Sequence, residues 1–539
     1  MQTVSEKWKT AHRQTLLNES YVEVSLDIAD PEALADAALQ GAHDNGAIYI
    51  SDSSEVANRI DKPPTPYCTL EQNMWLLNGG RKALPETNVR NEGYIGDTLS
   101  DATCVFSEKI PTLTISFSKK FSNLIPGVTI TWSNTYGEYA TDFIVRAYDG
   151  DKMIAEKEVN NNHSIKSVVM VDIVNYNRII IYMKKWCLPY HRPRVEEVFV
   201  GMNRVYYKTD LFNYSHKQSV SPVSTSLPKN EIQFSIGNIG GEYNPYNEQG
   251  MAKYLIERQE VKAKYGLKLN DGTVEWIKGG TFYLSDWYAK QNGLTADFTA
   301  RDLLEFMSAI YEDAHNLSRR SLYDLAKLVL NAANLPINND GTVKWYIDES
   351  LKSKYSTAPL PQDTLANCLQ LIANAGECVI YQDRDGILRI EQLPSDYTDY
   401  SIRPSNSYSK SEISLTKPIK QIDVKLYAYG MRLDEEGDEV GYESNSIVMT
   451  TTVGQSGEII TVDNPLITDM PMAESVGAWM ATHLGHRMTL DSSWRADVRL
   501  DALDIVTNEN EYNTNRVRMT DVEFKYNGAF RGTGEGKVI

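Results

Sequence analysis

The order of segments in the C-terminal part of the chain decides the fold. It runs from Asp463-Asn464-Pro465-Leu466-Ile467, through the amphipathic run Met472 to Leu490, to Ser493-Trp494-Arg495, Leu503-Asp504-Ile505-Val506 and Phe524-Lys525-Tyr526-Asn527-Gly528-Ala529-Phe530-Arg531-Gly532. Apolar residues at helical spacing predict a helix in the amphipathic run, and alternation with a period of two predicts strands after it. We therefore expect a strand, a helix, and then a short β-barrel that ends in a glycine-punctuated tail.

Toward the N-terminus, residues 67–202 have the pattern of an all-β unit. Alternating runs recur at 113–118, 128–132, 143–148, 153–159, 178–183 and 195–200, and Asp149-Gly150-Asp151 supplies a hairpin turn. Many short strands separated by turn residues predict an antiparallel sandwich. Residues 1–66 precede it, with a strand at Tyr21 to Ile28 and a proline-rich linker at 61–66.

The remaining chain divides into three predicted units. Residues 203–311 are expected to form a β-barrel. Its signature is Leu227 to Ile236, followed by a strand at 254–264, two strands around Gly279-Gly280 within 276–287, and an alternating run at 294–300. Residues 312–410 are expected to be α+β, with one helix capped by Ser321 and a second ended by Gly376. Residues 411–539 hold the second barrel with its amphipathic helix. The predicted fold class is thus mainly β with α+β: two barrels, a small α+β domain and an inserted antiparallel jelly roll.

Length and composition limit the class of protein. A chain of 539 residues with 42% hydrophobic residues can hold several packed domains, and no apolar run approaches the roughly 20 residues that span a bilayer. The polar start, Met1 to Lys9, lacks the apolar core of a secretory signal. Five widely spaced cysteines indicate reduced thiols made in a cytoplasm: Cys68, Cys104, Cys187, Cys368 and Cys378.

The formal net charge of −18 argues against a general nucleic-acid binder, because phosphate contacts need clustered Lys and Arg. Solubility explains such a charge. A second interpretation is an acidic channel that lets DNA slide through. The acidic run Asp434 to Glu439 is the candidate for such a wall, and a solvated hairpin tip is the alternative.

No motif in the chain predicts catalysis, a cofactor or a metal site. His483 and His486 have the helical spacing of a metal pair, but no acidic ligand accompanies them. Asp383-Arg384-Asp385-Gly386 resembles a fragment of a calcium loop, yet Asp and Gly at this spacing favour a β-turn. Walker, GxSxG and GxGxxG-before-helix patterns are absent. We therefore expect no catalytic, cofactor-binding or metal-binding residues.

The predicted sandwich has the one plausible ligand surface. Aromatic faces beside planar donors suit a sugar ring. The candidate carbohydrate-binding residues lie near predicted strand ends: Tyr136, Tyr139, Tyr190, His191, Arg192 and Arg194. Trp132 and Trp186 lie on alternating strands and are expected in the core instead. The two arginines could equally pack across the mouth of the sandwich or contact a neighbouring protein.

The C-terminal order of segments resembles that of the tail-tip hub proteins of tailed bacteriophages and related injection machines. Residues 203–539 carry the resemblance, with the signatures Leu227 to Ile236, Gly241-Glu242-Tyr243-Asn244-Pro245-Tyr246-Asn247 and the Asp383 turn. Residues 67–202 resemble a discoidin-type, galactose-binding-like jelly roll through Asn123 to Val128, Trp132 and Lys185 to Val198. The strand at Tyr21 to Ile28 is expected to join the first barrel, with the jelly roll inserted.

The resemblance implies a structural protein of the virion tail tip. Hubs of this family form homotrimeric rings that continue and close the tail tube. The implied partners are the distal tail protein or tail-tube ring, the tape-measure protein and a tail fibre or spike, with DNA only in passage. The alternative is an adhesin that binds a host cell-surface glycan through residues 67–202. A third possibility is a tail-associated hydrolase with a degenerate site.

Overall fold

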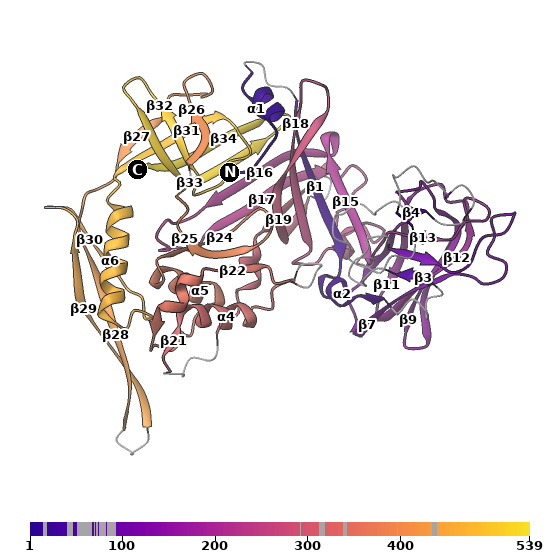
Figure 1. The fold of residues 1–539 in the computed structure, drawn as a ribbon, viewed down its shortest axis with the longest axis horizontal. Helices are drawn as coiled ribbons and strands as arrows, with labels where there is room; N and C mark the ends of the chain where they lie inside the picture. Colours follow the sequence, from indigo (N-terminus) through magenta and orange to yellow (C-terminus); the bar gives the residue numbers. More distant parts are fainter. Residues whose placement is uncertain are drawn as a thin grey trace.

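The computed structural model describes residues 1–14, 19–39, 47–50, 67–68, 71, 74, 82–83, 93–290, 293–311, 318–337, 342–395, 397–433 and 439–539. The chain is mainly β, as predicted. Figure 1 shows a large curved sheet in the centre, a β-sandwich to one side, and a helical unit below the sheet. A long hairpin projects from that lower part.

The central feature is a thirteen-stranded sheet made of two regions. We call the first sheet region β1 (Ser20–Ala29), β15 (Gly201–Tyr207), β16 (Leu211–Ser219), β17 (Lys229–Gly237), β18 (Glu260–Lys268), β19 (Val274–Ala289) and β20 (Thr295–Arg301). We call the second sheet region β26 (Tyr397–Ile402), β27 (Glu412–Leu415), β31 (Met488–Arg495), β32 (Ile505–Glu509), β33 (Thr514–Tyr526) and β34 (Phe530–Val538). The main path runs β15-β1-β18-β19-β20-β17-β16-β33-β34-β31-β27.

Strand β1 confirms the expectation for Tyr21 to Ile28. Its apolar positions are buried in alternation at Val22, Val24, Leu26 and Ile28. It pairs antiparallel with β15 on one side and with β18 on the other. The strand therefore belongs to the same sheet as residues 201–301.

The two expected barrels are one open sheet. Strand β16 pairs antiparallel with β33, from Tyr214 opposite Tyr526 to Ser219 opposite Asp521. Both regions also share one apolar core. Alternation in the sequence predicts a buried face on each strand, but it does not say which strand lies alongside. The prediction of two separate barrels is corrected to two curved regions of a continuous sheet.

The sandwich packs small antiparallel sheets around an apolar core. Its strands are β2 (Ala38–Leu39), β3 (Ala47–Ile50), β6 (Tyr94–Gly96), β7 (Thr112–Phe121), β8 (Ile125–Thr131), β9 (Ala140–Asp149), β10 (Lys152–Val159), β11 (Lys166–Ile173), β12 (Tyr176–Trp186), β13 (Arg194–Val195) and β14 (Glu197–Phe199). They form sheets in the orders β10-β9-β12-β7-β2, β11-β8-β14 and β13-β6-β3. Trp132 and Trp186 are fully buried in its core, as predicted.

The sandwich begins earlier in the chain than residue 67. Strand β2 pairs with β7, and β3 pairs with β6. The helix α2 (Pro31–Asp36) packs beside β7, and the small parallel pair β4 (Tyr67–Cys68) and β5 (Lys82–Ala83) follows. The chain leaves β1 at Ala29 and returns at Gly201, and these two residues are cross-strand partners. The prolines at 61–66 suggested that the sandwich starts at residue 67. The strand pairing shows that segments before these prolines already belong to it.

The α+β unit follows the first sheet region. Helices α4 (Leu322–Ala332) and α5 (Leu365–Ala375) pack together beside β21 (Arg320–Ser321), β22 (Trp345–Ile347), β23 (Tyr355–Ser356), β24 (Cys378–Gln382) and β25 (Leu388–Gln392). Ser321 caps α4 by accepting from the Asp324 amide at 3.1 Å, and Gly376 ends α5, both as predicted. The turn at Asp383 is closed by a hydrogen bond from the Gly386 amide.

Residues 419–484 lie outside the second sheet region, although the sequence pattern placed them in its barrel. They form a three-stranded sheet, β29 (Glu439–Thr452), β28 (Ile419–Leu433) and β30 (Glu458–Val462), covered by α6 (Met470–Leu484). Its buried residues, such as Ile422, Val424 and Val476, join the core of the α+β unit. Strands β28 and β29 form the hairpin that projects in Figure 1. The expected acidic turn at residues 434–438 lies outside the described residues.

Short helices complete the fold and correct one prediction. The helix α1 (Glu6–His12) packs on the second sheet region, and 3₁₀ turns lie at Lys208–Asp210, Ala252–Tyr254, Leu303–Phe306 and Glu349–Ser353. The strand expected at 254–264 begins only at Glu260, because Tyr254 ends a 3₁₀ turn and Arg258 has a φ of 69°. The two strands expected around Gly279-Gly280 are one strand, β19, whose pairing with β18 shifts register beside Gly279. In the described part of the chain, no helix is long and apolar enough to cross a membrane.

Candidate functional site

The loops at one end of the sandwich surround a buried carboxylate, Glu138, which lies between β8 and β9. Three donors converge on it, from the end of β12, from the loop that follows and from β13. His191 Nδ1 lies 2.9 Å from Glu138 Oε1, Trp186 Nε1 donates to Oε2 at 2.9 Å, and Arg194 donates to Oε2 at 3.2 Å. All four side chains are buried, so the group forms an internal polar cluster at the end of the apolar core.

A second carboxylate extends this cluster. Arg194 donates to both oxygens of Glu71 at 2.6 Å, and the backbone amide of Arg192 donates to Glu71 at 2.9 Å. The Arg194 guanidinium also lies over the ring of Tyr136, 5.5 Å from its centroid. A planar guanidinium that is held between two carboxylates and a ring is fixed in direction. The cluster therefore joins Glu71, from early in the sandwich, to the loops at its far end.

Glu138 and His191 stabilise each other's charged form. Burial acts to raise the pKa of Glu138, but the hydrogen bond from His191 and the charge of Arg194 outweigh it and hold that pKa below its usual value. The same hydrogen bond raises the pKa of His191, against the effect of burial. The histidine is thus stabilised as a cation and the glutamate as an anion.

The structure divides the six predicted carbohydrate residues into two groups. His191 and Arg194 are buried and their polar atoms face Glu138 and Glu71. Tyr136 and Tyr139 are partly exposed, Arg192 is partly exposed, and Tyr190 is 48% exposed. Any ligand contact therefore falls to the tyrosines and Arg192, and the buried pair can act only by holding these loops in place.

Sequence reasoning missed Glu138 and Glu71. Glu138 carried one usable signal, a charged residue among aromatic residues in Tyr136-Gly137-Glu138-Tyr139, directly before a strand. Glu71 carried none, because it lies more than a hundred residues from its partner Arg194.

His483 and His486 do not lie on one helix, as the spacing of a metal-binding pair would require. Helix α6 ends at Leu484 and is capped by Gly485, so only His483 is helical. Burial lowers the pKa of both histidines, helped by nearby cations such as Arg518. Among the described residues, no group of three or more His, Cys, Asp or Glu side chains is placed to hold a metal ion.

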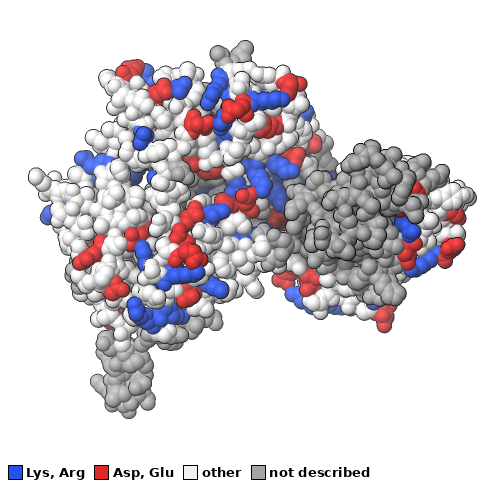
Figure 2. Space-filling view, in the orientation of Figure 1, with Lys and Arg blue, Asp and Glu red and all other residues white. Residues whose placement is uncertain are grey.

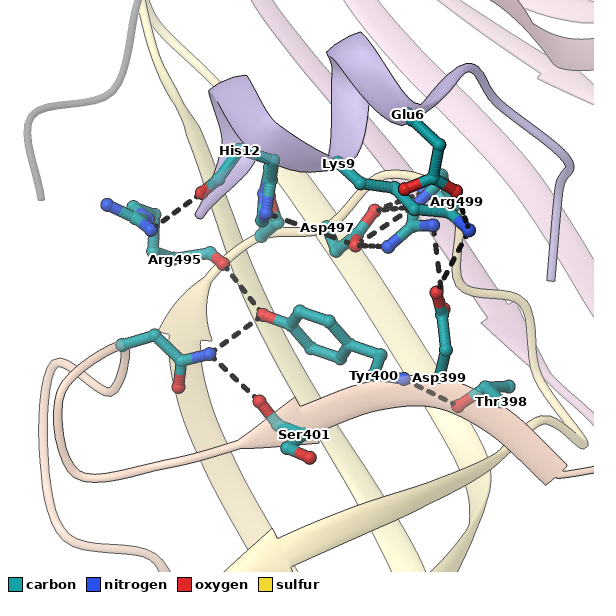
Figure 3. A network of polar contacts seen from close by, with 12 residues as sticks. Glu6, Lys9, His12, Thr398, Asp399, Tyr400, Ser401, Arg495, Asp497 and Arg499 are labelled. Carbon is teal, nitrogen blue, oxygen red and sulfur yellow. Dashed lines mark hydrogen bonds and ion pairs between the residues drawn. The ribbon is translucent and has the colours of Figure 1, made fainter. Parts of the chain in front are cut away.

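A second polar cluster ties the N-terminal helix to the second sheet region. Figure 3 shows Lys9 and His12 of α1 beside Asp497 and Arg499, which follow β31, and Asp399 of β26. Arg499 Nε lies 2.9 and 3.0 Å from the oxygens of Asp497, whose side chain is fully buried. The carboxylate of Asp399 forms ion pairs with Lys9 Nζ at 3.4 Å and with Arg499 Nη1 at 3.6 Å.

Hydrogen bonds to backbone carbonyls complete this cluster, which we call the clamp. Arg495 donates to the carbonyls of His12 at 2.8 Å and Gln14 at 2.7 Å, and Tyr400 donates to the Arg495 carbonyl at 3.2 Å (Figure 3). His12 Nε2 lies 2.9 Å from the Ala496 carbonyl oxygen. Because α1 leads into the chain that forms β1, the clamp joins both sheet regions at a second place besides the β16–β33 pairing.

Surface charge does not single out a binding face. Figure 2 shows acidic and basic side chains interspersed over the coloured part of this face, with no large area of one sign. The net charge of −18 is therefore not gathered on this face.

Comparison with known proteins gives matches in structure alone. No protein-family model matches the chain, and no curated protein matches it. The 43 kDa tail protein of prophage MuSo2 from Shewanella oneidensis is 10% identical, with a TM-score of 0.40, over 62% of this chain and 93% of that chain. A tail protein from Neisseria meningitidis is 11% identical, with a TM-score of 0.40, over 61% and 93%.

A prophage tail protein from Listeria monocytogenes is 12% identical, with a TM-score of 0.39, over 62% of this chain and 91% of that chain. All three of these similar structures are tail proteins. At such identities and TM-scores the function of this chain has to be argued from its own residues.

Proposed function

We propose that the chain is a structural hub at the distal tip of a phage or phage-like tail, where three copies form a ring around the tail axis. The observation that carries the proposal is the continuous sheet. The β16–β33 pairing and the shared core join two curved sheet regions into one continuous sheet. Two rigid sheet regions per copy would give six around a three-fold axis, which matches a three-fold ring to a six-fold tube.

The edge of the sheet supports assembly. Strand β27 ends the main path and pairs only with β31 along it. All four of its side chains are exposed, including Ile413 at 52% and Leu415 at 67%. Exposed edge strands with apolar side chains are normally covered or blocked, because they template pairing with another chain. A neighbouring copy in the ring would cover this edge.

The proposed role places the chain in the virion tail, without enzymatic activity. Its proposed partners are the distal tail protein or tail-tube ring above, the end of the tape-measure protein within, and a fibre or spike below. DNA would pass through the ring without binding. Closed rings of this kind use two different surfaces of each copy, one for each neighbour.

Copy number tests the proposal. Purified tail tips, analysed by native mass spectrometry or by calibrated quantification against a tail-tube protein, should contain three copies of this chain. Six copies, or one, would contradict it. The isolated chain in solution is not a suitable sample, because ring contacts of this kind are completed on the tail.

A second candidate function is adhesion to a host-surface glycan through the sandwich. It is favoured by the exposed Tyr190 and by the partly exposed Arg192 and Tyr136, which lie on the loops around the buried Glu138 cluster. Tyr190→Ala should remove binding of the intact chain to a glycan array. Tyr512→Ala, at a tyrosine that is 92% exposed on the second sheet region, is the matched control. Equal loss in both variants, or no glycan bound by the wild type, would overturn this candidate.

A further inference from the structure

A cleft of about 350 Å³ lies where the first sheet region meets the α+β unit. One side is formed by residues 227–231 at the start of β17, and the other by residues 301–308 and the first turn of α5. Its walls are partly apolar, through Leu227, Leu304 and Met307. Its charged lining residues are Lys229, Glu231, Arg301, Asp302 and Glu305.

The charges of the cleft leave one carboxylate without a cation. Arg301 forms ion pairs with Glu231 at 3.1 Å and with Glu305 at 3.5 Å. Lys229 forms a further ion pair with Glu231 at 3.8 Å. Asp302 has no ion pair among the described residues. Three acids and two bases line the cleft, so its formal charge is −1 when all five groups are ionised, and the excess charge then belongs to Asp302.

Asp302 is nearly fully buried, at 4% exposed, yet half of its carboxylate is unused. One oxygen, Oδ1, accepts the Leu304 amide at 3.1 Å and so caps the 3₁₀ turn. The other oxygen, Oδ2, is buried and has no hydrogen-bond partner. A buried acceptor without a donor destabilises the fold, and a ligand with an N–H group would relieve this cost.

We propose that this cleft binds a primary ammonium group on an aliphatic stem, such as a lysine side chain of another protein. A single positive charge matches the excess charge of the cleft, and the apolar walls match a methylene stem. With Oδ1 taken by the backbone, Asp302 offers one oxygen, so it suits a point-like ammonium better than the two-pronged guanidinium of arginine. The assignment does not depend on how the chain assembles.

The test measures binding of two small probes to the full chain by ligand-observed NMR at constant ionic strength. It is made at pH 8, above the pKa of about 7 to which burial raises Asp302, so that the carboxylate is mostly ionised. Acetyl-lysine methylamide should bind, and acetyl-arginine methylamide should bind more weakly. Asp302→Asn should weaken lysine binding about tenfold or more, because it removes a charge-assisted hydrogen bond of about 1.5–3 kcal/mol. The asparagine keeps the Oδ1 cap, and its thermal unfolding shows whether the variant is folded.

The matched control is Asp286→Asn, at an exposed aspartate of β19. It should leave lysine binding unchanged within about twofold, since its charge is screened by solvent. Equal weakening in both variants would indicate attraction to the net charge of the chain and would overturn the site. So would the absence of lysine binding to the wild type, or preference for the arginine probe.

Discussion

The buried Asp497–Arg499 pair should be important for stability. Asp497→Ala leaves the Arg499 guanidinium buried with only Asp399, at 3.6 Å, as its acid. Removing one partner of a buried pair costs about 3–5 kcal/mol, and we expect a loss of that size in urea unfolding. Lys410→Ala, at an exposed pair with Glu511, should leave stability nearly unchanged. Equal effects would show that the clamp in Figure 3 contributes little.

Single residues were partly predictable from the sequence. Trp132 and Trp186 were expected in the core and lie there, because large apolar side chains on alternating strands have one buried face. Glu138 and Asp302 were not singled out, although each lies in a buried polar site. A carboxylate in a chain with 72 acidic residues gives no local sign of burial, since burial depends on segments that meet only in the fold.

Asp302 should make stability depend on pH. Burial raises its pKa from 3.8 to about 7. In the folded chain the carboxyl keeps its proton where the unfolded chain has lost it, so its presence costs stability as pH rises between these values. Asp302→Asn removes this cost and keeps the cap. The variant should therefore gain stability relative to wild type from pH 5 to pH 8, by urea unfolding. A constant difference across this range would contradict the pKa shift.

At the scale of elements, capping and turn chemistry were predicted best. Ser321, Gly376 and the Asp383 turn act locally, within a few residues, so the sequence contains what determines them. The predicted start of the strand at 254–264 was wrong. Arg258 has a positive φ, which cannot be predicted from an arginine in the sequence. The predicted position of β28 to β30 in the second barrel was wrong for another reason. Alternation indicates a buried face, and it does not identify the element that covers it.

The last strand illustrates close packing that glycine permits. A Cβ on Gly534 of β34 would lie 2.4 Å from the Asp521 carbonyl oxygen and 3.2 Å from the Trp494 ring. Gly534→Ala should therefore destabilise the chain by about 1–3 kcal/mol, as overpacking does in cores. Thr533→Ala, on the opposite face of the same strand, should cost less than about 1 kcal/mol by the same thermal or urea measurement. Similar stability of the two variants would contradict the packing around Trp494.

At the scale of the whole molecule, the joint between the sheet regions could not be predicted from the sequence. Strands β16 and β33 are separated by about 300 residues, and only the fold brings Tyr214 opposite Tyr526. An antiparallel sandwich was predicted from the alternating strands of residues 67–202. Its boundaries were not, because Ala38–Leu39 and Ala47–Ile50 join its sheets from before the proline-rich linker.

The sandwich should be separable from the rest of the chain. Ala29 and Gly201 are cross-strand partners, so a short glycine-serine loop from Asp30 to Gly201 can replace residues 31–200 as a hairpin. Because the sandwich has its own core, the shortened chain should still unfold cooperatively. Circular dichroism during thermal unfolding would measure this. Loss of a cooperative transition would show that the central sheet depends on the insertion.

A cryo-electron microscopy reconstruction of the intact tail tip, computed without imposed symmetry, tests the hub proposal most directly. The proposal predicts three copies of this chain around the tail axis, with first and second sheet regions alternating around the ring and β27 covered by a neighbouring copy. A ring of six copies, or a single copy at the periphery of the tip, would contradict it.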